Sequence, residues 1–202
     1  MHIQHNLSLK SYNTFGIDVN TRYFAEYSSI GELKEILGSE IINANPWLHI
    51  GGGSNLLFLK DFEGIILHSQ LKSIEKISET NEIVLLKVGA GMVWDDFVAY
   101  CVSNNYYGVE NLSLIPGEVG ASAVQNIGAY GMEVKDVIET VDTIHTETLN
   151  ERIFTNEECR YGYRKSIFKE ELRGKYIITN VTFRLKKQPD YQLDYQHLRE
   201  AV

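Results

Sequence analysis

The chain carries the segment Ile50-Gly51-Gly52-Gly53-Ser54-Asn55-Leu56-Leu57, directly after three residues that extend an apolar strand pattern back to Trp47. Consecutive residues without a Cβ let backbone amides crowd around an anion, and a pyrophosphate is the natural occupant. Leu56 stands where GxGxxG needs its third glycine, and no Gly-Lys-Ser/Thr follows, so a Rossmann site and a P-loop are disfavoured. A tight turn between strands is the alternative, although such a turn needs only one or two glycines.

A second segment rich in small residues runs from Ile115 to Gly131. Such a run lets the main chain approach a large flat ligand, while Gln125, Asn126 and Tyr130 offer polar side chains. Taken alone, the segment is equally well interpreted as a glycine-rich loop packed under a helix. Together with the first segment, it predicts an extended dinucleotide laid along two loops.

Periodicity around these segments predicts strands mixed with a few helices. Ser29 and Glu32 form a capping box before a helix that ends at Gly38. A second helix is expected from about residue 93 to 103, with Cys101 on its apolar face. Strands are expected at residues 47–50, 64–68, 83–88, 137–145 and 181–185. We therefore expect an α+β fold without a regular βαβ repeat.

The composition is that of an ordinary globular protein, with 202 residues, 44% hydrophobic and 23% charged. A net charge of −8 argues against a nucleic-acid partner. Cys101 and Cys159 lack CxxC spacing and the six histidines lack an HExxH pattern, so neither a disulfide framework nor a metal site is expected. No signal-peptide pattern or apolar run of roughly 20 residues occurs, which favours a cytoplasmic protein without membrane contact.

Five motifs in sequence order carry a resemblance to a known family. They are Asn13-Thr14-Phe15-Gly16-Ile17, Gly51-Gly52-Gly53-Ser54-Asn55, Ile115-Pro116-Gly117, Gln125-Asn126-Ile127-Gly128-Ala129-Tyr130-Gly131 and Tyr161-Gly162-Tyr163-Arg164-Lys165-Ser166-Ile167-Phe168. Over essentially its whole length the chain resembles the UDP-N-acetylenolpyruvoylglucosamine reductase family. The resemblance implies the bipartite FAD-binding fold of the vanillyl-alcohol oxidase and hydroxylase type. It places one α+β subdomain at residues 1–70 and the other, with the start of the substrate-loop region, at 71–202.

The resemblance also implies a reaction and its site. In that family NADPH reduces bound FAD, which passes a hydride to UDP-N-acetylglucosamine enolpyruvate, giving UDP-N-acetylmuramate for peptidoglycan synthesis. Arg164 matches the arginine that stabilises charge at the substrate carboxylate. The residues matched to FAD binding are Gly51, Gly52, Gly53, Ser54, Asn55, Leu56, Ile115, Pro116, Gly117, Ser122, Val124 and Gly128. Those matched to substrate binding are Gln125, Tyr130, Tyr163 and Tyr195.

Structural alternatives stand beside these assignments. Without its motif, Arg164 is one arginine in a mixed-charge stretch that would face solvent. Tyr195, with Leu198 and Val202, fits the apolar face of a helix as well as it fits a lid over the uridine nucleotide.

The sequence also departs from the family's pattern. The family's proton-donating serine and assisting glutamate belong to a C-terminal domain with motifs such as Gly-Ser-Phe-Phe-Lys-Asn-Pro, and no such sequence occurs here. We therefore expect a truncated, inactive chain, monomeric, from a parent that is a reductase. A flavin-dependent oxidase or dehydrogenase and a non-catalytic nucleotide-binding module stay open as alternatives.

Overall fold

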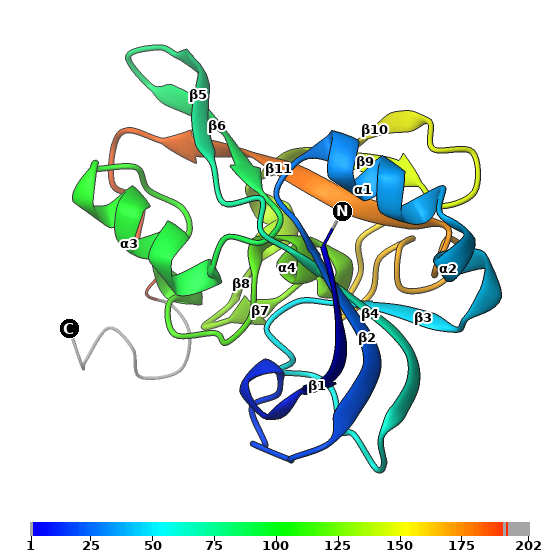
Figure 1. Ribbon diagram of the computed structural model, residues 1–202. Coiled ribbons are helices and arrows are strands. Elements are labelled where there is room, and N and C mark those ends of the chain that lie inside the picture. The colour runs from blue at the N-terminus through cyan, green and yellow to red at the C-terminus, as the bar shows by residue number, and fades with distance from the viewer. Residues whose placement is uncertain (1, 192, 194–202) are drawn as a thin grey trace.

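A computed structural model describes residues 2–191 and 193, which form two main β-sheets with helices between and around them (Figure 1). The first sheet has the strand order β1-β2-β4-β3. β1 (Ile3–Ser8) runs antiparallel to β2 (Asn20–Tyr27), whereas β2 and β3 (Trp47–Ile50) both run parallel to β4 (Phe62–Ser69). The first glycine-rich segment therefore leaves the sheet at the carboxyl end of a parallel strand, which is where open sheets commonly bind ligands.

Two helices, α1 (Ile30–Leu37) and α2 (Glu40–Ala44), connect β2 to β3. The predicted cap of α1 is confirmed, because Ser29 Oγ accepts the backbone N–H of Glu32 at 3.1 Å. The Glu32 carboxylate returns to the backbone N–H of Ser28 at 2.7 Å, one residue earlier than a standard capping box.

The second sheet is antiparallel, with the order β10-β9-β11-β6-β5. Its strands are β5 (Ile74–Glu79), β6 (Ile83–Gly89), β9 (Ile138–His145), β10 (Glu151–Thr155) and β11 (Tyr176–Lys186). The predicted second helix is confirmed as α3 (Trp94–Ser103), and it buries Cys101 as expected. Trp94 and Phe97 of α3 pack against Phe183 of β11, with ring centroids 6.0 and 4.6 Å apart.

The second glycine-rich segment is not one continuous loop, because it contains the helix α4 (Val119–Gln125). Small residues let α4 approach the chain after β6 so closely that a Cβ on Gly120 would lie 2.8 Å from the Cβ of Ala90. Figure 1 shows α4 near the centre of the molecule, where it packs against β6 and β11. The remaining elements are β7 (Gly128–Ala129), β8 (Met132–Glu133) and three 3-10 helices, η1 (Lys10–Tyr12), η2 (Glu110–Leu112) and η3 (Val134–Asp136).

One core cluster joins the two sheets. It combines Leu33 and Ile36 of α1 and Leu67 of β4 with Ile144 of β9 and Ile177 of β11. The predicted boundary at residue 70 falls between the last strand of the first sheet and the first strand of the second, but a division into separate domains stays a prediction. Nowhere in residues 2–191 does a helix have the length and hydropathy needed to cross a bilayer.

Candidate functional site

The structure brings the two glycine-rich segments side by side. Ser54 Oγ donates to the carbonyl of Pro116 at 3.1 Å, and Asn55 Nδ2 donates to Gln125 Oε1 at 3.1 Å. A Cβ on Gly52 would stand 3.7 Å from the Cα of Gly117. The two segments that contain the predicted cofactor residues thus lie against each other, with backbone facing backbone at Gly52 and Gly117.

Close approach explains why this surface needs glycine. Gly53 has φ +67°, and a Cβ there would lie 1.9 Å from the carbonyl oxygen of Tyr12. The neighbouring Asn13 is buried, and its side chain bonds Leu9 O at 2.7 Å and both polar groups of the Ile17 backbone, at 2.9 and 3.0 Å. The motif at residues 13–17 therefore folds as a turn whose start packs against Gly53 of the first glycine-rich segment.

The loop before the second glycine segment is anchored to α3. Asp95 accepts hydrogen bonds from the backbone N–H of Leu114 at 2.7 Å and from Ser113 Oγ at 2.8 Å. The bond from Leu114 and then that from Ser113 lower the pKa of Asp95, because both stabilise its charged form. Leu114, with φ +61°, is thereby held in an exposed position, with 82% of the residue accessible to solvent.

Arg164 lies in a tight turn closed by two backbone hydrogen bonds between Gly162 and Lys165, at 3.0 and 3.1 Å. Its backbone is left-handed, with φ +56°. The exposed guanidinium donates to the carbonyl of Gly128 at 3.2 Å. Within residues 2–191 no carboxylate pairs with it. An oriented guanidinium with spare donors is suited to binding a carboxylate in bidentate fashion.

The C-terminal end of α4 holds both parts of the site. Asn126 caps the helix in the left-handed conformation, with φ 47°, and is fully buried. Its Nδ2 donates to the carbonyl of Gly162 at 2.8 Å, and its Oδ1 accepts the N–H of Lys135 at 3.1 Å. Gln125 next to it binds Asn55. Sequence reasoning gave Asn126 only a polar side chain, although an asparagine after a run of helix-compatible residues is a known C-cap signal.

The other predicted residues differ in exposure. Tyr163 and Tyr130 are 83% and 51% exposed as whole residues, so both are accessible to a ligand. Ser122 is buried, and its hydroxyl donates to Val119 O within α4 at 2.7 Å. Leu56, Ile115 and Val124 pack partly against core clusters. Tyr195 lies outside the described residues.

Comparison with known proteins identifies this arrangement. The family described as "FAD binding domain" matches residues 21–147, a range that includes both glycine-rich segments. The chain belongs to this FAD binding domain family. FAD is therefore its cofactor, as predicted. The backbone surface fits such a ligand, because Gly52 and Gly117 bring the main chains of the two segments together, and consecutive backbone amides of glycine-rich segments bind pyrophosphate groups.

Individual relatives refine the match. The UDP-N-acetylenolpyruvoylglucosamine reductase of Bacteroides fragilis is 55% identical over 200 residues, which cover 99% of this FAD binding domain and 60% of the relative. The crystal structure of the corresponding reductase from Thermus caldophilus superposes with a TM-score of 0.76 at 26% identity, covering 94% of this chain and 64% of that one. These matches confirm the predicted resemblance. The chain spans about 60% of the length of the curated relatives that it matches.

The predicted fold class is also confirmed. Substrate-bound p-cresol methylhydroxylase superposes on the chain with a TM-score of 0.58 at 14% identity, covering 86% of this chain and 37% of that one. This second likeness concerns the fold alone. The FAD binding domain thus has the α+β architecture that the motifs implied.

Proposed function

We propose that the protein carrying this FAD binding domain reduces UDP-N-acetylglucosamine enolpyruvate to UDP-N-acetylmuramate in the cytoplasm, with NADPH as the hydride donor, for peptidoglycan synthesis. One observation supports the proposal above the others: the end of α4 ties the exposed cation Arg164 to the glycine segments through two adjacent residues, Gln125 and Asn126. Relatives 46–55% identical to the chain bear the name of this reductase.

The chain's own residues would hold the cofactor at its pyrophosphate. FAD, when bound, supplies the hydride-carrying ring system. The amides of Gly51, Gly52, Gly53 and Gly117 would surround the phosphates, since glycine lets these parts of the main chain lie close together. Ser54 and Asn55 fix this surface by bonding across to the second segment.

Arg164 would hold the substrate carboxylate. Reduction of the enolpyruvyl double bond places negative charge on the carbon next to that carboxylate, so a fixed cation there lowers the barrier. The bond to Gly128 O orients the guanidinium before substrate arrives. Tyr163, Tyr130, Gln125 and Tyr195 complete the proposed substrate contacts.

Two measurements test the proposal. Titration of the chain with FAD, followed by quenching of flavin fluorescence, should show saturable binding; a chain that neither contains nor takes up flavin contradicts the cofactor assignment. A protein that carries this chain together with the full length of its relatives should oxidise NADPH only when the enolpyruvyl sugar nucleotide is present. Oxidation at equal rate without that substrate would exclude the proposed reaction.

A further inference from the structure

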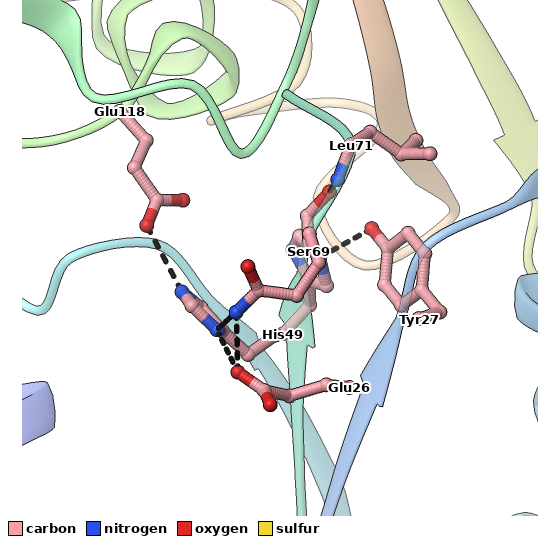
Figure 2. A network of polar contacts seen from close by, with 8 residues as sticks. Glu26, Tyr27, His49, Ser69, Leu71 and Glu118 are labelled. Carbon is pink, nitrogen blue, oxygen red and sulfur yellow. Dashed lines mark hydrogen bonds and ion pairs between the residues drawn. The ribbon is translucent and has the colours of Figure 1, made fainter. Parts of the chain in front are cut away.

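A charged cluster lies next to the first glycine-rich segment. Its residues are not among the proposed FAD-binding or substrate-binding residues. His68 of β4 places Nε2 2.9 Å from Glu118 Oε1 and Nδ1 3.0 Å from Glu26 Oε1. The side chains of His68 and Glu118 are each 9% exposed. Figure 2 shows the carboxylates of Glu118 and Glu26 reaching the cluster from different sides. One imidazole thus joins the first sheet to the loop that precedes α4.

The geometry calls for a positively charged imidazole. Each ring nitrogen of His68 faces a carboxylate oxygen, and a neutral imidazole has only one N–H to donate. Burial by itself lowers the pKa of His68, but the hydrogen bonds and charges of Glu118 and Glu26 outweigh it, so the pKa is raised. Gln70 Nε2 also donates to Glu26 Oε1 at 2.5 Å. Among the described residues, Glu118 has His68 as its side-chain partner.

The other groups around His68 add little charge near neutral pH. The ring of Tyr12 stands edge-on to His68 at 5.4 Å, and burial followed by the charge of Glu26 raises its pKa. Burial and then the positive charge of His68 lower the pKa of His49, on β3, to about 4, so His49 is neutral. One cation therefore serves two carboxylates.

Glu118 connects this cluster to the cofactor surface. Its Oε2 lies 3.1 Å from the point where a Cβ on Gly51 would stand. A carboxylate without a cationic partner, so close beneath a pyrophosphate-binding segment, would repel the phosphates with little water to screen the charge. The pair with His68 offsets the charge of Glu118.

We propose that the His68 imidazolium is a positioning residue for the pyrophosphate end of the FAD site, where it neutralises and orients Glu118 beneath Gly51. The inference rests on the FAD-binding part of the proposed function and not on the reaction. Because the pKa of His68 is raised on folding, its stabilising effect is complete below the ordinary histidine pKa of about 6.5 and is lost as the pH rises through the folded pKa. FAD should bind more weakly above that folded pKa.

The test compares FAD dissociation constants of four forms of the 202-residue chain: wild type, H68Q, E118Q and H68Q/E118Q. Each is measured at about pH 6, below the ordinary histidine pKa of about 6.5, and at about pH 8.5, well above it. The wild type should bind more tightly at the lower pH. H68Q should lose about tenfold in affinity at the lower pH, equivalent to about 1.4 kcal/mol, and should show no pH dependence. The double variant should recover most of that loss, because the neutral amide that E118Q introduces needs no cation. A histidine that only fills space would give a double variant no better than H68Q.

The substitution H5Q is the matched control, since His5 is exposed on β1 away from the cluster and its loss should leave the pH dependence intact. Equal affinities for wild type and H68Q at both pH values, or no recovery in the double variant, would overturn the inference. If no form binds FAD, the proposed function fails instead. Thermal unfolding without FAD then tests the charge pairing directly. The unfolding midpoint of H68Q should lie further below that of the wild type at the lower pH, and the midpoint of H68Q/E118Q should lie closer to the wild type than that of H68Q does. A difference between wild type and H68Q that does not depend on pH refutes the inference.

Discussion

Arg164 combines a left-handed backbone with a guanidinium that has no carboxylate partner in residues 2–191. If the proposed reaction is correct, Arg164→Ala in a protein that carries this chain over the full length of its relatives should lower kcat/KM by about 100-fold to 1000-fold, since a charge-stabilising donor contributes roughly 3–4 kcal/mol. The kcat/KM of Arg164→Lys should lie between those of the wild type and the alanine variant, because lysine keeps the charge but not the planar guanidinium. Steady-state assays measure both, with FAD content as the control. A loss below about tenfold for the alanine variant would argue against the assigned role.

Asn126 anchors the arginine turn to the end of α4. Asn126→Ala should lower the free energy of unfolding by roughly 2–4 kcal/mol, because it leaves a carbonyl and an N–H unpaired in the interior and removes a residue suited to the left-handed region. Urea denaturation measures the change. Asn104→Ala is the control, since the exposed Asn104 side chain bonds only the nearby Tyr100 carbonyl and should cost well under about 1 kcal/mol. Similar losses in the two variants would contradict the anchoring role.

At the scale of elements, local signals determined what the sequence could predict. α1 and α3 have apolar periodicity, and α1 also has a cap, so both were found within a residue or two. β5 was missed because five of its six residues are exposed and show no alternation. α4 was missed because seven mostly small residues carry no helical stripe, and packing against the chain at Ala90 stabilises the helix. Secondary structure that depends on distant neighbours leaves little trace in the local sequence.

The site followed the same division. The two glycine-rich segments are recognisable from their composition. Their proximity could be predicted because an extended dinucleotide needs two such loops to bind it. The contact of Asn126 with Gly162 and that of His68 with Glu118 could not, because each joins residues 36 or 50 positions apart and involves ordinary polar side chains.

Gly16 and Gly53 have similar left-handed backbones but different surroundings, so substituting each by alanine distinguishes backbone strain from a steric clash. Gly16 has φ +62° and open space where a Cβ would stand, whereas at Gly53, with φ +67°, a Cβ would strike the Tyr12 carbonyl oxygen at 1.9 Å. Gly16→Ala should cost about 1–2 kcal/mol of unfolding free energy, the strain of a left-handed alanine. Gly53→Ala should cost more than about 3 kcal/mol, because backbone must move, and should abolish FAD binding. Equal losses of unfolding free energy in the two variants would mean that the η1 backbone moves away from a Cβ at residue 53 with little cost, which would contradict the prediction. Urea melts and FAD titration measure these effects.

At the scale of the whole molecule, the shared core makes the two sheets depend on each other. Ile144 and Ile177 of the second sheet pack with α1 and the first sheet, so neither sheet can open without exposing apolar surface of the other. We expect a single cooperative unfolding transition.

The two tryptophans make this expectation measurable. Trp47 lies on β3 in the first sheet and Trp94 on α3 against the second. In the variants W47F and W94F, the remaining tryptophan should report the same urea midpoint as far-UV circular dichroism of the same variant. Fluorescence and dichroism midpoints that separate within one variant would show that the sheets unfold independently.

The helix α4 also sets the position of both anchors of the site. Gln125 and Asn126 are consecutive, and they hold the first glycine segment and the arginine turn respectively. One added residue inside α4 would turn both anchors by about 100° around the helix axis and move them about 1.5 Å along it. An insertion in the exposed turn around Gly174, which has open space around its Cβ position, would disturb neither. Variation in chain length should therefore be tolerated in the surface turn but not within residues 119–125, where it would move Gln125 and Asn126 away from their partners.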